Sequence, residues 1–347
     1  MRFKTIKHNP ILRPDPKSVW QSLMVYNPGV IRKNGVYHLF YRAVGAGWIS
    51  KIGHAVSGDG KKFICDKKPL LSPEMTIEKN GLEDPRIVVI DGLYYLTYTA
   101  YDGFSARLCL ATSKDLKNWI RHGEMIPDWD FKRAHGFIVP WDSAQKTPAA
   151  AKYWSKAGGI FPEKINNKFY MLFGDRHIWL ANSDDGLSWR PTYKPFLKPR
   201  LNFFDSAHIE MGPPPLKTKK GWLVLYHGIE NKKGRIIYRL GFVLLDLKNP
   251  SKILYRTSKP VFAPPAGHIT SGFINILPGG FKAMEIMEQK NLKKFIKKTA
   301  QKRELPRIIF CNGAVIVGDI LKIYYGISDT TIGSAAVKLK TLLSIKK

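Results

Sequence analysis

The sequence has few cysteines, and it lacks several motifs that indicate a particular class of enzyme chemistry. Cys65, Cys109 and Cys311 are the only cysteines among 347 residues, and they are far apart. Their spacing fits neither a zinc site nor a disulfide framework, so we expect reduced thiols in the core of a cytoplasmic protein. No Gly-rich phosphate loop, zinc spacing or G-x-S-x-G elbow occurs, which argues against nucleotide transfer, metallohydrolase and serine hydrolase chemistry. We expect no metal and no cofactor.

Long apolar runs are also missing. The N-terminal residues MRFKTIKHNPILRP lack the apolar stretch of a signal peptide, and no segment is long and apolar enough to span a bilayer. We therefore expect neither secretion nor a membrane partner.

Acidic residues are scarce relative to basic ones. The chain has 27 Asp and Glu against 56 Lys and Arg, which gives a formal net charge of +29. Such a charge raises nucleic acid as a partner, but the lysines are scattered through nearly every turn. We favour a solvated, lysine-rich surface over a polyanion site, because charge runs are usually solvated.

One aromatic phrase is present five times along the chain. The copies are NGVYHLFYRA, DGLYYLTYTA, NNKFYMLFGD, KKGWLVLYHG and GDILKIYYGI, anchored at Tyr37, Tyr94, Phe169, Trp222 and Leu321. Each follows a short strand with a polar or proline-bearing corner, in NPGVI, EDPRIV, KAGGIFP, EMGPPPL and NGAVIV. Third segments with a Ser and Asp turn follow several copies, and the phrases KPLLSP, KPFLKP and KPVFAP are expected to supply fourth strands.

Four strands in each of five repeats predict an all-β fold, a five-bladed β-propeller over residues 1–347 as a single catalytic domain. A β-sandwich is the alternative, but it would not require a fivefold recurrence. Residues 282–305 break the pattern and predict a basic helix or hairpin before the last blade, which packs an oligomer interface or clips the propeller shut.

The first strand of each propeller blade lines the central axis, so the five corners should converge. Pooling them gives the candidate site residues Asn27, Glu83, Asp84, Arg86, Lys156, Glu210 and Asn312. Two facing carboxylates suit inverting cleavage of a glycosidic bond, in which one acid protonates the leaving oxygen and the other activates water.

Asp84 is the candidate acid and Glu210 the candidate base. Pro85 is expected to hold Asp84 in an extended conformation, and burial beside Glu83 to favour its neutral form, with Arg86 opposing. The competing interpretation is that both are salt-bridged structural carboxylates.

Aromatic side chains in loops after strands could stack on sugar rings. The candidates are Tyr101, Trp48, Trp141, Trp154 and Phe204. Most aromatic residues in such a protein are core residues, so each is individually weak evidence.

The phrases NPGVIRKNGVYHLFYRAVG, GLEDPRIVVIDGLYYLTYTAYDG, FPEKINNKFYMLFGD, GPPPLKTKKGWLVLYHG and YYGISDTTIGSA together resemble glycoside hydrolase family 130, in that family's order. The resemblance implies a five-bladed propeller that cleaves β-mannosides with inversion and without a metal, by hydrolysis or by phosphorolysis.

The resemblance also implies roles for individual residues. Asp84 matches the family's catalytic acid, which in phosphorylases is thought to pass its proton through a mannose hydroxyl. Asn27, Arg42 and Asp329 match residues that hold the sugar, and we expect Asp175 and His208 beside them. His227 matches a phosphate contact of the phosphorylases.

The departures from the pattern favour hydrolysis of β-mannosides or β-manno-oligosaccharides. The Lys-Asp and His-Arg pairs of phosphorylases are replaced by KAGGIFPEK and MLFGDRH, and Glu210 stands where phosphorylases have glycine. An anion site could still form from Lys156, Arg176, His177, His208 and His227, so phosphorolysis to mannose 1-phosphate, with inorganic phosphate as co-substrate, is the alternative. A propeller that binds glycans without turnover is a second alternative, and a fructosidase or arabinosidase would require an acid where Asn27 stands.

Overall fold

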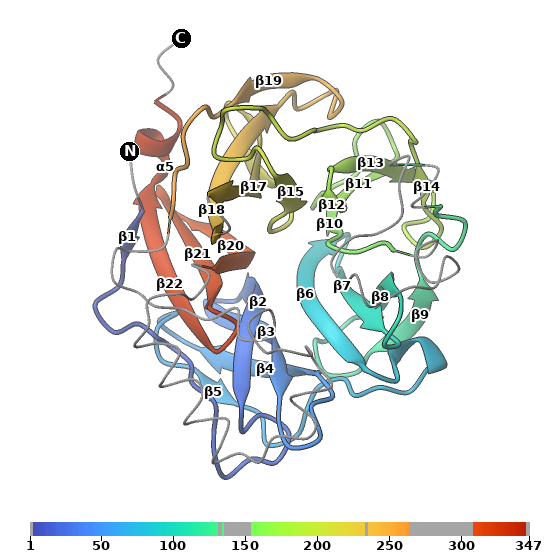
Figure 1. The fold of residues 1–347 in the computed structure, drawn as a ribbon, viewed down its shortest axis with the longest axis vertical. Helices are drawn as coiled ribbons and strands as arrows, with labels where there is room; N and C mark the ends of the chain where they lie inside the picture. Colours follow the sequence, from blue (N-terminus) through green and yellow to red (C-terminus); the bar gives the residue numbers. More distant parts are fainter. Residues whose placement is uncertain (1–2, 131–133, 135–153, 233–234, 264–307, 345–347) are drawn as a thin grey trace.

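Each recurring aromatic phrase forms the second strand of a sheet, and its anchor residue is buried in all five cases. The computed structural model describes residues 3–130, 134, 154–232, 235–263 and 308–344. Its five sheets are arranged around one central axis, as Figure 1 shows, so the fold is the predicted five-bladed β-propeller. The predicted insertion at 282–305 lies outside the described residues.

The blades follow the order of the chain. Blade 1 consists of β2 (Met24–Lys33), β3 (Val36–Val44), β4 (Lys51–Ser57) and β5 (Ile64–Cys65). Blade 2 consists of β6 (Gly81–Ile90), β7 (Leu93–Tyr101), β8 (Ala106–Ser113) and β9 (Ile120–Glu124). Blade 3 consists of β10 (Gly159–Ile160), β11 (Phe169–Phe173), β13 (Trp179–Ser183) and β14 (Arg190–Pro191). Neighbouring strands within these blades are antiparallel.

Blade 4 has additional strands, and blade 5 joins the two ends of the described chain. Blade 4 contains β12 (Asp175–Arg176), β15 (His208–Met211), β16 (Leu216–Thr218), β17 (Gly221–Lys232), β18 (Arg235–Leu245) and β19 (Ile253–Arg256). Blade 5 contains β20 (Ile309–Val317), β21 (Ile320–Ile327), β22 (Thr331–Lys338) and β1 (Lys4–Thr5). β1 pairs with β22 at its outer edge and thereby closes the ring.

The fourth strands are not where the sequence predicts them. The KP phrases make only isolated bridges, either to the third strand or to the residue just before it. The bridging residues are Leu71, Leu197 and Phe262. The real fourth strands precede those phrases in the chain. Proline has no backbone N–H group and cannot donate to a ladder, so these proline-rich phrases cannot extend into strands.

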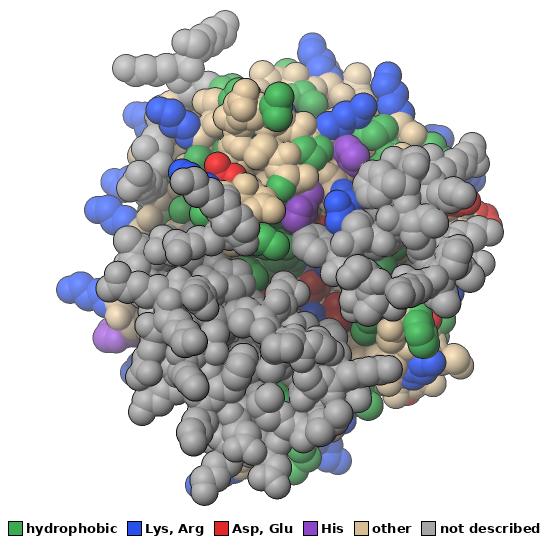
Figure 2. Space-filling view, in the orientation of Figure 1, with side chains coloured by type: hydrophobic (Ala, Val, Ile, Leu, Met, Phe, Trp, Pro, Cys, Tyr) green, Lys and Arg blue, Asp and Glu red, His purple; other side chains and the backbone are tan. Residues whose placement is uncertain are grey.

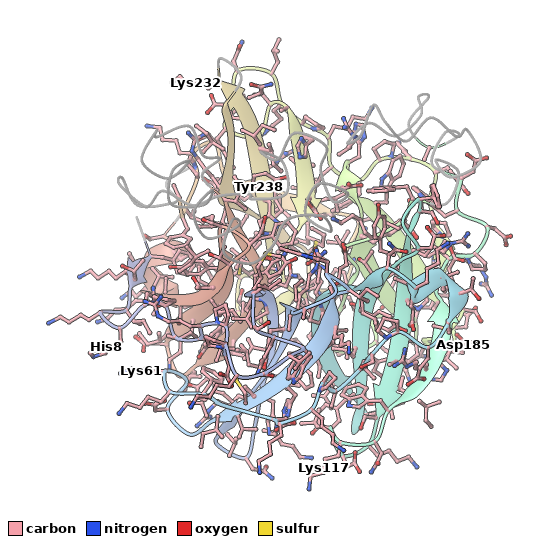
Figure 3. All side chains as sticks on the ribbon, turned by 60° about the horizontal axis from the view of Figure 1, so that its bottom comes forward. His8, Lys61, Lys117, Asp185, Lys232 and Tyr238 are labelled. Atoms are coloured by element: carbon pink, nitrogen blue, oxygen red, sulfur yellow. The ribbon has the colours of Figure 1, made fainter. Side chains whose placement is uncertain are left out.

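The Ser and Asp turns after the third strands share one geometry. In the turn after β4, the Asp59 carboxylate accepts the backbone N–H groups of Lys61 and Lys62, and the Ser57 hydroxyl accepts that of Gly60. The same pattern is present at Asp115 and Asp185. Figure 3 labels Lys61, Lys117 and Asp185 in these turns, along the lower and outer edge of the molecule.

The hydrophobic core is divided among the contacts between neighbouring blades. Val88 and Tyr95 of blade 2 pack with Phe169 and Trp179 of blade 3, for example, and similar clusters join the other neighbours. Helices are few in the described part: η1 (Thr76–Glu78) and α5 (Leu339–Leu342). No described helix is long and apolar enough to cross a membrane.

Candidate active site

Three first strands carry the same irregularity, and it lies at the axis. The pairing register shifts between Tyr26 and Gly29 in β2, between Glu83 and Arg86 in β6, and between Phe310 and Gly313 in β20. A β-bulge of this kind re-aims the side chains that it contains. Figure 2 shows acidic side chains in the hollow at the centre of this face, where the first strands converge.

Asp84 lies inside the bulge of β6, and its backbone is not extended as predicted. Its φ is 52°, in the left-handed region, and Asn27 in the bulge of β2 has φ 48°. Each residue precedes a proline, which disfavours the right-handed helical region but leaves the left-handed one accessible within a bulge. Because few residues other than glycine, asparagine and aspartate adopt this conformation, the residue types fit the geometry.

The Asp84 carboxylate is buried and surrounded by donors and cations. Asn27 Nδ2 donates to its Oδ1 at 2.8 Å, Arg42 Nη1 lies 3.8 Å from Oδ1, and Lys156 Nζ lies 4.0 Å from Oδ2. Burial raises the pKa of Asp84, but the charges of Lys156, Arg42 and Arg86 outweigh it, so the net pKa is lowered. The sequence leaves the sign of this shift open, and the surrounding cations favour the ionised carboxylate of Asp84.

Glu210 lies in β15 and shares Lys156 with Asp84. Lys156 Nζ is 3.1 Å from Glu210 Oε1, so the Glu210 and Asp84 oxygens are at most about 7 Å apart, the sum of their distances to Nζ. Burial raises the pKa of Glu210 to about 7, and the negative charge of Asp175, directly opposite on β12, adds to this against the attraction of Lys156. The two predicted carboxylates thus converge on one lysine.

A second cluster surrounds Arg42 of β3. Its Nη2 donates to Glu83 Oε1 at 2.5 Å, and its guanidinium carbon lies 5.0 Å from the centre of the Tyr26 ring. Burial raises the pKa of Asp329, in the turn between β21 and β22, to about 7 despite the positive charge of Arg42. Arg42 therefore links Glu83, Asp84 and Asp329 electrostatically.

Three residues predicted to bind ligand make structural contacts within the protein. Arg86 is fully buried, and it donates to the backbone carbonyls of Gly212, Met211 and Asp84. Asn312 is also buried, with its Nδ2 3.3 Å from the Asn27 carbonyl oxygen, so it supports the corner of blade 1.

His227 is the third of these residues. Its Nε2 accepts the backbone N–H of Cys311 at 2.8 Å, and its ring stacks on Phe310 with centroids 4.2 Å apart. Burial lowers the pKa of His227 to about 3, so the ring is neutral and cannot supply a positive charge to phosphate.

The remaining basic candidates gather on the other side of Glu210. Arg176 follows Asp175 in β12 and pairs with Ile209, and it is partly exposed. His208 is buried on the same strand as Glu210, and burial lowers its pKa to about 4. His177 packs its ring against Trp179 at 5.9 Å. Among the described basic candidates, Lys156 contacts Glu210 directly, and Arg176 lies on the strand that pairs with β15.

The aromatic candidates have different outcomes. Trp154 Nε1 donates to Asp175 at 3.2 Å, which holds its indole beside the site, whereas Tyr101 donates to the Gly103 carbonyl at the end of β7. Phe204 is buried against Tyr226 in blade 4, so the expectation that it stacks on sugar is wrong. Trp48 is partly exposed in the loop after β3, and Trp141 lies outside the described residues.

Tyr238 lies beside the site but is not at a first-strand corner, because it belongs to a third strand. It is on β18 opposite Ile229, which in turn pairs with His208, and its ring meets His208 and Phe310 at 6.0 and 6.3 Å. Burial and then the charges of Glu210 and Asp329 raise its pKa. In Figure 3 it lies well below the tip of the hairpin marked by Lys232, near the middle of the molecule.

The chain is similar in sequence to a known family and to several of its members. A family model described as beta-1,4-mannooligosaccharide phosphorylase matches residues 3–276. A 1,2-beta-oligomannan phosphorylase of Thermoanaerobacter sp. (strain X514) is 35% identical, with 99% of each chain covered. A beta-1,2-mannobiose phosphorylase of the same organism is 33% identical, with 97% of each chain covered.

Solved structures give the same result. A beta-1,2-mannobiose phosphorylase from Listeria innocua, in complex with beta-1,2-mannobiose, has a TM-score of 0.72 and 25% identity, covering 99% of this chain and 98% of its own. A glycosyl hydrolase from Bacteroides ovatus has a TM-score of 0.76 and 27% identity, covering 97% and 94%. With a family match over most of its length and a propeller whose carboxylates meet at the axis, the chain belongs to glycoside hydrolase family 130.

Proposed function

We propose that this enzyme is a β-mannoside phosphorylase that acts on β-1,2-linked oligomannosides and releases mannose 1-phosphate. The observation that carries the proposal is the position of Lys156 between Asp84 and Glu210. Its Nζ atom lies 4.0 Å from the Asp84 carboxylate and 3.1 Å from the Glu210 carboxylate. The two relatives matched over nearly the whole chain, both phosphorylases of β-1,2-linked substrates, support the same reaction and linkage.

In this reaction, a phosphate oxygen bonds to C1 of the mannose while the bond from C1 to the leaving oxygen breaks. Asp84 supplies a proton to that oxygen, directly or through a hydroxyl of the bound mannose, and the proton of the phosphate restores it. Lys156 and Arg176 stabilise the phosphate. Arg42, Glu83, Asn27 and Asp329 hold the sugar.

Phosphate binding also answers how an ionised Asp84 can act as an acid. Lys156 is the cation with the greatest effect on the Asp84 pKa, which it lowers. A phosphate dianion beside Lys156 offsets this charge, so Asp84 takes up its proton more readily when the nucleophile is bound. Asp84 is thus protonated in the complex with phosphate, in which it acts as the acid.

The sequence pattern favours hydrolysis, and one observation keeps it as a second candidate. Glu210 lies at most about 7 Å from Asp84 by way of Lys156, and burial raises its pKa to about 7, which suits a base that activates water near neutral pH.

Incubation with β-1,2-mannobiose, with and without inorganic phosphate, tests the proposal. We expect mannose 1-phosphate, detected by phosphorus NMR, only when phosphate is present, and much less product from β-1,4-mannobiose. Release of free mannose at the same rate with and without phosphate would replace phosphorolysis by hydrolysis. No turnover on any mannoside would favour a glycan-binding propeller.

A further inference from the structure

Glu210 has an unusual position for a residue at a phosphate site. It is 2% exposed, and its carboxylate is held by an ion pair with Lys156 at 3.1 Å. Its strand β15 lies between β12 and β17, which place Asp175 and His227 directly opposite it. A carboxylate buried in this way changes the charge of the site when it gains or loses a proton.

The charges around Glu210 come from four other elements as well as from its own strand. The titratable groups that face it are Lys156, Asp175, Asp84, Arg86, His227 and His208. Tyr238 on β18 completes the set, and its pKa is raised by the charge of Glu210. Both histidines are neutral near pH 7, because burial lowers their pKa values to about 4 and about 3. Asp329 also has a pKa of about 7, but Arg42 is the cation that affects it most. Glu210 is the group with a pKa near neutrality that forms an ion pair with Lys156.

Building on the proposed phosphorolysis, we propose that the protonation state of Glu210 selects the nucleophile: phosphate attacks when Glu210 is neutral, and water attacks when it is ionised. The same residue is thus the specificity-determining group for two reactions at one site. Substrate, acid and leaving group are common to both.

In the neutral state, Lys156 is not neutralised by Glu210 and can pair with a phosphate oxygen, to which the Glu210 O–H donates a hydrogen bond. A phosphate oxygen then bonds to C1 as the leaving sugar takes the proton of Asp84. An ionised Glu210 would instead place like charges side by side in a buried site, which disfavours phosphate strongly.

In the ionised state, Glu210 accepts a proton from water as the water oxygen bonds to C1 and the bond to the leaving oxygen breaks. Asp84 again supplies the proton that the leaving oxygen needs, and the proton taken by Glu210 returns to Asp84 through solvent. Free mannose is the product. Neither phosphorolysis nor hydrolysis, written in this way, requires an oxidant, a metal or a second co-substrate.

Phosphorolysis of β-1,2-mannobiose yields one mannose 1-phosphate and one mannose, whereas hydrolysis yields two mannoses, so half of the mannose in excess of mannose 1-phosphate measures hydrolysis. The ratio of mannose 1-phosphate to this hydrolytic amount, measured in one reaction, isolates the effect of Glu210. Both products come from the same bound substrate, so factors that act on substrate binding alone cancel in the ratio. We would measure it with β-1,2-mannobiose and fixed inorganic phosphate from about pH 5.5 to 8.5. The ratio is expected to fall roughly tenfold for each pH unit, as the neutral fraction does relative to the ionised one.

Two variants separate Glu210 from the titration of phosphate itself. Glu210→Gln is expected to give a high ratio that no longer falls with a tenfold slope, because its side chain cannot ionise or accept a proton from water. Glu163→Gln alters an exposed carboxylate paired with Lys217 and should keep the slope of the parent enzyme.

Each outcome decides between the two proposals. Mannose 1-phosphate at a ratio that is independent of pH in the parent enzyme, or with equal slopes in the parent and Glu210→Gln, overturns the selection by Glu210 and leaves phosphorolysis standing. Equal amounts of mannose 1-phosphate and mannose at every pH also overturn it, because all of the mannose is then the leaving sugar of phosphorolysis and water never competes. Free mannose alone at every pH overturns phosphorolysis, and the selection with it.

Discussion

A single lysine serves two carboxylates at the centre of this propeller. Lys156 lowers the pKa of Asp84 and also opposes the rise in that of Glu210, yet the two acids differ in their net shifts. Asp84 has Arg42 and Asn27 in addition, whereas Glu210 faces Asp175. Environments that separate two carboxyl pKa values in this way assign them different roles.

Replacing the acid tests its role at this scale. For Asp84→Asn we expect kcat/KM on β-1,2-mannobiose to fall by roughly 10²- to 10⁴-fold, the usual contribution of a general acid. The loss should be much smaller with 4-nitrophenyl β-mannoside, because nitrophenolate leaves without a proton. Asp91→Asn, at an exposed turn, is the matched control. Equal losses on both substrates would contradict the assignment.

The raised pKa of Glu210 also predicts a pH dependence of stability. Burial raises this pKa from 4.5 to about 7, so between these values the folded protein binds a proton that the unfolded chain has lost. Stability from this group is therefore complete below about pH 4.5 and is lost as pH rises to about 7.

Glu210→Gln should remove that dependence. We expect the variant to be more stable than the parent at pH 8, by on the order of 1–3 kcal/mol, and equally stable at pH 4. Urea denaturation at the two pH values measures the difference, with Glu163→Gln as the exposed control. A variant that is less stable at pH 8 would show that the ion pair with Lys156 outweighs burial.

The bulged first strands are the elements that bring the site together. Gly29 directly follows the bulge of β2, and a Cβ atom there would lie 2.7 Å from the Pro85 carbonyl oxygen of β6. Gly313, at the equivalent point of β20, would meet the Pro28 carbonyl oxygen at 2.7 Å. Glycine at these points lets each corner approach the next, and so positions Asn27 against Asp84.

Gly29→Ala adds only one methyl group, but it should reduce catalysis strongly. Because the obstructing atom belongs to the backbone, the Asp84 corner must shift, and we expect about a tenfold or greater loss of kcat/KM with roughly 1–3 kcal/mol of stability. Gly58→Ala, where a Cβ atom meets nothing within 4 Å, should change neither. Parallel kinetics and melting curves give the comparison, and normal activity of Gly29→Ala would contradict the role of the close approach.

The repeat predicted which elements meet, but not how their charges combine. Asp84 and Glu210 could be paired from sequence because first strands line the axis of a propeller. The sign of the Asp84 pKa shift depends on Arg42 from blade 1 and on Lys156, just before blade 3, and no local pattern carries those distances. Phe204 was misassigned for a similar reason: it fills space left by Gly228 and Gly241, which become neighbours only through strand pairing.

At the scale of the whole molecule, the ring is closed by the segment before blade 1. Beyond the pairing of β1 with β22, Asn9 donates to the Ser334 carbonyl at 2.9 Å and accepts the Ser334 N–H at 2.9 Å. The Ile11 N–H donates to the Ile332 carbonyl at 2.8 Å. A closed ring has no exposed first and last blade, so these bonds stabilise every blade at once.

Asn9→Ala should lower the stability of the entire ring. Loss of its side-chain bonds leaves the Ser334 N–H without its acceptor, and we expect a cost of about 1–3 kcal/mol. A single transition shifted as a whole in chemical denaturation is the expected result. Asn118→Ala, in an exposed turn of blade 2, should have a smaller effect. A separate early transition would mean that blade 5 opens by itself.

Arg86 ties β6 of blade 2 to the Met211 and Gly212 carbonyls of blade 4, two blades that are not neighbours. Arg86 is buried, so this tether lies inside the protein and fastens the strand that carries Asp84 to a blade across the ring. Removing the guanidinium would leave the two carbonyl oxygens of blade 4 without their donor and would loosen blades 2 and 4 from each other at the position of the acid.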